Sequence, residues 1–259
     1  MKLTTERQRL TFLAISALVV ASIIGSLSRI AQDPSYHRFA DEIPLLQIPN
    51  WQNVLSNLPF AVVGILGLMT IARSKSQAYA VGEQKTGWII FFSGVFLTAL
   101  GSGYYHWHPD NWGLFWDRLP MTMGFSGLFA SIIGERVSQR AYQLLLWPLV
   151  ILGLLSVVYW IWTEKAGAGD LRPYAFIQFY PIIAIPCLIG LCPPRFTHAK
   201  YVGFAIGCYV LAKISEDMDQ AIWTTTGEMT SGHALKHLLA AAGCYFLLKM
   251  IKVRHHAET

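Results

Sequence analysis

Charged residues are scarce in this chain. Of its 259 residues only 14% are Asp, Glu, Lys or Arg, while 54% are hydrophobic. A soluble domain averages about 25% charged residues. This shortage excludes an ordinary water-soluble domain and a disordered polar chain. The formal net charge of +5 is explained by basic loops on one side of a membrane, so it does not predict binding to nucleic acid.

Cysteine is also rare, and the four cysteines lie within or at the ends of apolar segments. None has the paired spacing of a disulfide framework or a thiolate metal site, so both are excluded. We expect small core residues instead. The chain also lacks linkers, low-complexity tracts and fixed-period repeats, which favours one continuous fold.

Long apolar runs take the place of charge. A bilayer core about 30 Å thick requires roughly 20 residues of helix per crossing. Because backbone groups in lipid must be bonded within their own segment, and no barrel-like alternation is present, we predict an all-α polytopic transmembrane helical bundle. The first run also resembles a signal peptide, but no clear A-x-A cleavage site follows, so we expect it to stay as a helix. Eight spans are predicted, at about 10–29, 52–72, 86–106, 117–135, 141–162, 173–192, 200–216 and 232–251.

The basic residues predict an orientation. If the amino terminus is cytoplasmic, most Lys and Arg residues fall in inside segments, and the outside loops hold only Arg29, Arg38, Lys165 and Arg172. The positive-inside rule therefore predicts both termini in the cytoplasm and an even number of spans. Many acidic residues fall on the opposite side, which we expect to be the extracytoplasmic or lumenal face.

Three histidines near span ends predict a metal site. His233 and His237 are four residues apart, so on a helix their imidazoles share one face. An ionisable side chain at membrane depth is costly and usually has a partner. His106 ends the third span and is expected on the same outer face. Three protein ligands plus an open position are typical of catalytic zinc, whereas a fourth protein ligand would indicate a structural zinc site.

Ser102 and Asp117 are candidate partners of this site. Ser102 precedes His106 by one helical turn, and Asp117 begins the next predicted span. A carboxylate near a metal can accept a proton from water or orient an imidazole. Two structural alternatives stay open: Ser102 could bond to its own helix backbone, and Asp117 could cap the helix that follows.

The motifs together carry a family resemblance, spread over about residues 36–248. In order and spacing, SN in NVLSNLPF, GSxxxH and DxLPM in GSGYYHWHPDNWGLFWDRLPM, and HxxxHL in GHALKHLLAA resemble the signatures of alkaline ceramidases. These enzymes belong to a wider superfamily of heptahelical membrane hydrolases that includes adiponectin-receptor proteins. The resemblance implies that His106, His233 and His237 bind zinc, and that Ser102 and Asp117 hold the water at the metal. It also implies that Ser56 and Asn57 support the site.

The resemblance extends to architecture and substrate. The seven-helix family core matches spans two to eight, so residues 1–30 are expected to form an extra amino-terminal helix and residues 31–259 the catalytic domain. The implied reaction is zinc-dependent hydrolysis of a ceramide-type membrane lipid to a fatty acid and a sphingoid base. That the bond is an amide and not an ester comes from the resemblance alone. Beyond the lipid bilayer and this substrate, no obligate protein partner is inferred.

The chain departs from the family pattern in two places. The family has Asp-Glu-Leu-Pro-Met where this chain has Arg118 after Asp117, so one charge is reversed. Eukaryotic members also carry an acidic calcium site before the first core helix, and that motif is not reproduced here. Asp41, Glu42 and Asn50 nevertheless offer oxygen atoms of the kind that Ca²⁺ prefers. Calcium is therefore a second cofactor prediction.

A transporter or a metal-responsive receptor is the alternative from another class. Lys213 and Lys236 lie in predicted spans, and charges within the membrane often mark ion pathways. Inverted repeats or broken helices would favour transport, and the sequence shows neither clearly.

Overall fold

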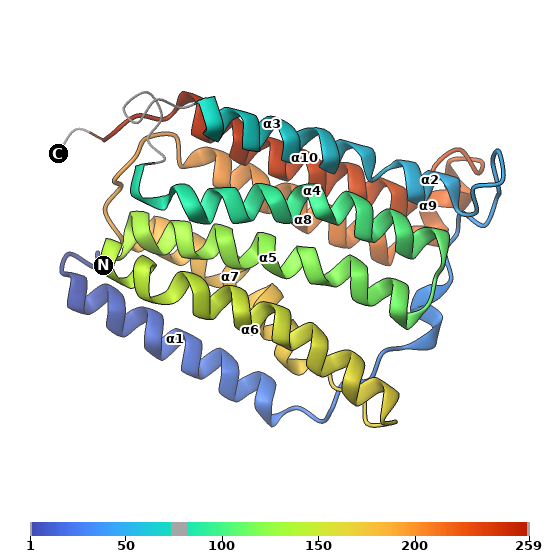
Figure 1. The fold of residues 1–259 in the computed structure, drawn as a ribbon, viewed down its shortest axis with the longest axis horizontal. Coiled ribbons are helices and arrows are strands. Elements are labelled where there is room, and N and C mark those ends of the chain that lie inside the picture. Colours follow the sequence, from blue (N-terminus) through green and yellow to red (C-terminus); the bar gives the residue numbers. More distant parts are fainter. Residues whose placement is uncertain (1, 74–81, 258–259) are drawn as a thin grey trace.

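The computed structural model describes residues 2–73 and 82–257, which form a bundle of helices without any β-strand (Figure 1). The predicted all-α polytopic bundle is therefore confirmed. The helices are α1 (Glu6–Ser26), α2 (Trp51–Leu55), α3 (Leu58–Arg73), α4 (Lys85–Trp107), α5 (Asn111–Arg136), α6 (Gln139–Lys165), α7 (Arg172–Leu191), α8 (Lys200–Asp217), α9 (Asp219–Thr225) and α10 (Gly232–Val253), with short 3₁₀ turns η1 (Pro34–His37) and η2 (Gly82–Gln84).

Seven of the eight predicted spans each coincide with one helix and the span 52–72 coincides with α2 and α3, although the helices differ in how apolar they are. In the described part of the chain, six segments are long and apolar enough to cross a membrane: α1, α2 with α3, α4, α6, α7 and α10. The remaining two, α5 and α8, contain 26 and 18 residues. Both carry charged residues, and those of α8 include Lys213 and Glu216. Eight membrane crossings thus stay a prediction.

The helices lie side by side along one axis, and α1 begins at the same end of the bundle at which α10 ends (Figure 1). α5 packs against α4, α6 and α7, while α10 packs along α8 and α3. α1 contacts α7 and buries only Leu13. The opposite end holds the amino-terminal parts of α5 and α10, the carboxyl-terminal end of α4, and the short helices α2 and α9 (Figure 1).

Helices α4 and α5 approach each other closely because glycines line their contact. A Cβ atom built on Gly101 would lie 2.1 Å from the backbone oxygen of Trp116, and one on Gly94 would lie 2.6 Å from the backbone nitrogen of Gly124. Pro120 lacks the N–H that the Trp116 oxygen would otherwise accept within α5. Small residues allow such close packing between membrane helices. The contact at Gly101 places Ser102 next to the helix that carries Asp117.

Helix α5 begins six residues before its predicted start at residue 117. The Asp110 side chain accepts a hydrogen bond from the Gly113 N–H at 2.6 Å and caps the helix. Asp117 lies inside the helix and is buried. The alternative that Asp117 serves as the helix cap is therefore wrong.

Candidate metal centre

Three histidines meet at the end of the bundle where α4 ends and α10 begins. The ring centroids of His106 lie 4.8 Å from His233 and 4.9 Å from His237, and the last two lie 5.0 Å apart. One ring nitrogen from each lies within 4.8 Å of the others, and all three residues are buried. Among the described residues this is the one cluster of three or more potential ligands, and it could hold a metal ion. The predicted triad is thus brought together.

Hydrogen bonds assign the tautomer of His237. Its Nδ1 lies 2.8 Å from the Ser56 hydroxyl, and that hydroxyl lies 3.2 Å from the backbone oxygen of Asn53. Because a carbonyl oxygen only accepts, Ser56 donates to Asn53 and accepts the Nδ1–H of His237. Nε2 of His237 then carries a lone pair. Metal-binding histidines usually donate their other N–H in this way.

His106 provides the clearest test of fit to a metal. Both of its ring nitrogens are buried, and in the part of the chain that the structure describes neither has a hydrogen-bond partner. A buried polar atom left unpaired costs about 1–3 kcal/mol. A metal ligand bond would satisfy one of these nitrogens. The residue is fixed through its backbone, whose oxygen accepts a bond from the Asn50 side chain at 2.9 Å.

His233 contacts a partly buried group of charges. Lys236 Nζ lies 2.9 Å from its Nε2 and 2.7 Å from Glu216 Oε1, while Lys213 pairs with the other oxygen of Glu216. An ammonium group only donates, so the Lys236 contact uses the lone pair of Nε2. A metal bound through this nitrogen would replace Lys236 as its partner, and Lys236 would keep its ion pair with Glu216.

Ser102 in α4 and Asp117 in α5 form a pair, and Ser102 lies one helical turn before His106. Both are buried, and the Ser102 hydroxyl lies beside the Asp117 carboxylate. Lys236 and Glu216 are among the charges close enough to influence Asp117. Asn57, at the start of α3, donates to the Asn53 oxygen at 2.8 Å and lies 3.5 Å from Nδ1 of His237. The structure therefore brings Ser56 and Asn57 to His237, and it pairs Ser102 with Asp117 within the electrostatic range of Lys236.

The candidate calcium ligands have other contacts. Asp41 accepts hydrogen bonds from the N–H groups of Gln52 and Asn53 at 2.8 and 3.3 Å, at the start of α2. Burial raises the pKa of this carboxyl group, while those N–H groups act to lower it. The Asn50 amide is bonded to His106, and Glu42 is exposed. Calcium binding by Asp41, Glu42 and Asn50 stays a prediction.

Arg118, the residue that reverses a family charge, faces aromatic rings. Its guanidinium carbon lies 4.4 Å from the ring centroid of Trp160 and 5.0 Å from that of Tyr174. One of its nitrogens donates to the side-chain oxygen of Gln32 at 2.7 Å. Arg118 thus holds the segment before α2 in place. Cation–π contacts stabilise its guanidinium group, and none of the described carboxylates lies within ion-pair distance of it.

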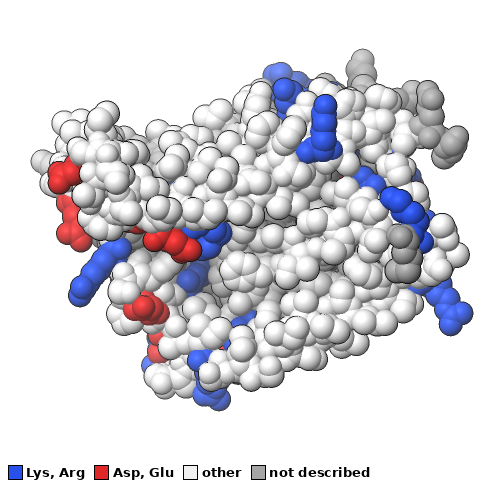
Figure 2. Space-filling model, turned by 180° about the vertical axis from the view of Figure 1, so that it is seen from behind, with Lys and Arg blue, Asp and Glu red and all other residues white. Residues whose placement is uncertain are grey.

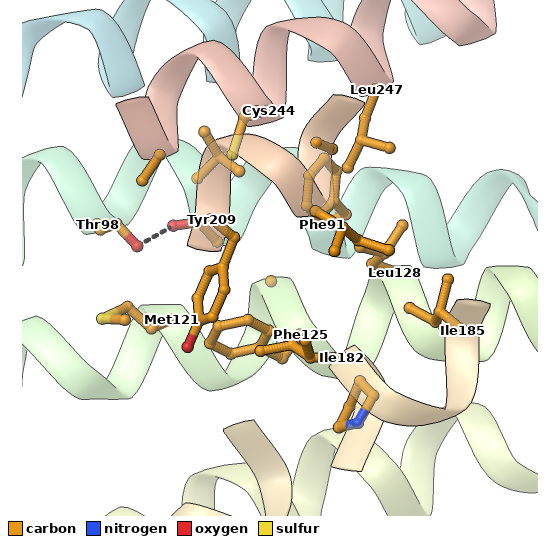
Figure 3. Close-up of a pocket in the computed structure, with 18 of the residues that line it drawn as sticks. Phe91, Thr98, Met121, Phe125, Leu128, Ile182, Ile185, Tyr209, Cys244 and Leu247 are labelled. Atoms are coloured by element: carbon orange, nitrogen blue, oxygen red, sulfur yellow. Dashed lines mark hydrogen bonds between the residues drawn. The ribbon is translucent and has the colours of Figure 1, made fainter. Parts of the chain in front are cut away.

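An apolar cavity of about 180 Å³ lies between α4, α5, α7, α8 and α10 (Figure 3). Phe125 and Tyr209 lie side by side in its wall, and the Thr98 hydroxyl is bonded to the Gly94 oxygen at 2.8 Å. Phe60 lines the cavity and also packs against His237, with ring centroids 6.5 Å apart. The cavity therefore ends near the metal centre and suits a hydrocarbon chain.

Two links at this centre were not predicted from the sequence. Lys213 and Lys236 were expected as membrane charges, but not as partners of Glu216, and Lys236 was not expected to contact His233. The available signal was that Lys236 stands between His233 and His237 in the sequence, which indicates a charge near the candidate metal site.

Comparison with known proteins agrees with the site. The family model described as Ceramidase matches residues 46–259. No curated protein matches the chain. The matched segment contains the three histidines, Ser102 and Asp117, whereas α1 lies outside it. Because the match covers most of the sequence, the chain belongs to the ceramidase family.

Proposed function

We propose that the protein is a zinc-dependent intramembrane hydrolase that cleaves the amide bond of ceramide-type lipids into a fatty acid and a sphingoid base. Membership of the ceramidase family indicates a hydrolase that acts on an amide. The observation that carries the zinc assignment is the buried triad of His106, His233 and His237, in which the nitrogens of His106 have no partner among the described residues.

The triad would hold the metal, and two neighbours would handle the reacting atoms. Three neutral imidazoles match the ligand set of catalytic zinc. A bound zinc ion would polarise the amide carbonyl and make water more acidic. The Asp117 carboxylate would accept a proton from the attacking water and pass it to the leaving amine. Ser102 would donate to the oxygen that gains charge, and one such donor is commonly worth about 10²–10³ in rate.

The cavity and the aromatic residues around the site suit a lipid. The apolar cavity would hold a hydrocarbon chain next to His237. Tyr104, Trp107, Trp112 and Trp116 are exposed at the end of the bundle that contains the site. Trp and Tyr are typical of the membrane interface, where a lipid head group would lie. These features support a substrate that stays in the bilayer while its amide reaches the metal.

The alternatives receive less support. Lys213 and Lys236, which favour a transporter or receptor in the sequence, both pair with Glu216. Lysines that are held in ion pairs with a neighbouring carboxylate do not require an ion pathway. A structural zinc site normally has four protein ligands. The described residues supply three histidines.

The direct test combines metal analysis with lipid hydrolysis. The protein purified in detergent should contain about one zinc per chain and release fatty acid from ceramide but not from an ester analogue of the same chain length. A chelator should abolish the release, and zinc, not calcium, should restore it. His106→Ala, His233→Ala and His237→Ala should each lose zinc, with exposed His108→Ala as the matched control. Full zinc content in the three variants, or unaffected hydrolysis after metal removal, would contradict the proposal.

A further inference from the structure

The segment of residues 32–41, here called the strap, crosses the end of the bundle that contains the histidines. It includes the turn η1 and precedes α2. Its hydrogen bonds join Gln32 to Arg118 at 2.7 Å, Tyr36 to Tyr105 at 3.1 Å and to Glu216 at 2.9 Å, and Ala40 to Asp219 at 2.9 Å. The strap is thus attached to α5, α4, α8 and α9. These attachments fix its position over the metal centre.

Phe39 is the strap residue that covers the histidines. Its ring is almost completely buried, and its centroid lies 4.6 Å from that of His106 and 4.9 Å from that of His233, both in edge-to-face geometry. Tyr105 packs against another side of the same ring, with centroids 5.8 Å apart. A phenyl group can neither bind zinc nor transfer a proton. Its effect on the centre is to narrow the approach from the strap side, so that polar solutes larger than the water used in hydrolysis are kept out.

Two phenylalanines therefore border the triad from different elements. Phe39 covers His106 and His233 from the strap, whereas Phe60 in α3 packs against His237 and lines the apolar cavity. The strap is a loop between α1 and α2 and lies at the bundle end, where the membrane interface is expected. The cavity lies between helices, within the depth of the bundle. A solute that approaches from the strap side therefore meets Phe39, whereas a hydrocarbon chain in the cavity would lie beside Phe60.

We propose that Phe39 is a specificity-determining residue that closes the metal centre toward polar solutes larger than water, so that amides held in the membrane are hydrolysed and water-soluble amides are not. The inference rests on the proposed function for its metal and its reaction. It adds a residue that touches two candidate ligands and selects how substrates reach them.

The first experiment compares Phe39→Ala with a matched variant, Phe115→Ala. Phe115 belongs to the same buried aromatic cluster but packs against Trp112 and Trp116. In Phe39→Ala, EDTA should remove zinc at least about tenfold faster, and kcat/KM for a water-soluble short-chain amide should rise relative to that for a long-chain ceramide. Phe115→Ala should change neither quantity more than about twofold. Equal rates and equal substrate ratios in the wild type and Phe39→Ala would overturn the proposal.

A second measurement needs neither zinc nor activity. After metal removal, histidines are modified with diethyl pyrocarbonate and quantified by peptide mass spectrometry, with the exposed His255 and His256 as internal references. His106 and His233 should react slowly in the wild type and about tenfold faster in Phe39→Ala. If both histidines react equally slowly in the two proteins, the proposed role of Phe39 is overturned, even if zinc-dependent hydrolysis is found. If Phe39 is found to shield the histidines but the protein binds no zinc, the proposed function is refuted instead. Phe39→Leu, with an intermediate effect expected, replaces Phe39→Ala if the latter does not fold.

Discussion

At the scale of single residues, a substitution of Asp117 distinguishes a role in catalysis from a role in metal binding. The Asp117→Asn substitution keeps the shape of the side chain but removes its ability to accept a proton. We expect zinc content to stay near that of the wild type while kcat falls by about 10²–10⁴ and KM changes little. Asp110→Asn is the matched control, because Asn caps a helix about as well as Asp and turnover should survive. Near-normal turnover of Asp117→Asn would remove this residue from the mechanism.

A substitution of Ser56 tests whether its hydrogen bond orients the His237 ring for metal binding. Ser56 accepts the Nδ1–H of His237, so Ser56→Ala leaves that N–H without its 2.8 Å partner. Loss of such a supporting bond commonly lowers metal affinity about 10–100-fold, which zinc competition with a fluorescent chelator would measure. Ser156→Ala is the control, since this buried hydroxyl bonds to the Gly153 oxygen in α6. Equal zinc affinities of Ser56→Ala and the wild type would show that the bond does not orient His237.

The meeting of the three histidines was predictable because two of them are one helical turn apart and the third ends an apolar run. Contacts between distant segments were not predictable in the same way. The bond from Tyr36 to Glu216 joins residues 180 positions apart, and no local periodicity records it. Phe39 likewise has no sequence signal, since one phenylalanine in a loop is unremarkable until the strap is placed against α4 and α10.

At the scale of elements, the close contact of α4 with α5 positions Ser102 beside Asp117. Gly101→Ala would place its Cβ 2.1 Å from the Trp116 oxygen, so the helices would have to separate. Such overpacking typically costs about 1–3 kcal/mol of stability, and we expect a lower Tm together with a more than tenfold loss of turnover.

Gly103→Ala is the control on the same helix. A Cβ there meets no atom within 4 Å, and Ala favours a helix by about 0.5–1 kcal/mol over Gly. Its Tm should equal or exceed that of the wild type. If both variants keep wild-type turnover and Tm, the glycine contact does not position the site.

The sequence predicted the long helices but not their local interruptions. The predicted span 52–72 is divided into α2 and α3, with Ser56 as the C-cap of α2. This division places Ser56 and Asn57 against His237. Helix α9 was not predicted, because its seven residues are too short to show helical periodicity. It carries Asp219, which accepts the N–H of His233 at 2.8 Å.

At the scale of the whole molecule, α1 is set apart from the rest. It lies outside the segment matched by the ceramidase family and packs on α7 at the edge of the bundle. Arg172 at the start of α7 donates to the backbone oxygens of Gly25 and Leu27, at and just beyond the end of α1. A division into an extra helix, 1–30, and a catalytic domain, 31–259, stays a prediction. These contacts show how the edge helix is attached.

The charges differ between the two ends of the bundle. In the view of Figure 2, Asp and Glu gather at the end that holds the metal centre, whereas the other end shows Lys and Arg alone. The basic end is the one where α1 begins and α10 ends (Figure 1). Cytoplasmic loops of membrane proteins carry an excess of Lys and Arg. This distribution supports a metal centre on the extracytoplasmic or lumenal side, with both termini in the cytoplasm.

Single cysteines at the two ends can test this orientation in intact cells. In a variant whose four native cysteines are replaced by alanine, His108→Cys places a thiol in the exposed turn between α4 and α5, and Pro194→Cys places one in the exposed segment between α7 and α8. If the protein lies in the plasma membrane, an impermeant thiol reagent should label His108→Cys before lysis and Pro194→Cys only after it. The reverse pattern would invert the topology and place the metal centre on the cytoplasmic side. Labelling of both before lysis would show that the two ends are not separated by the bilayer, which would contradict a spanning bundle altogether.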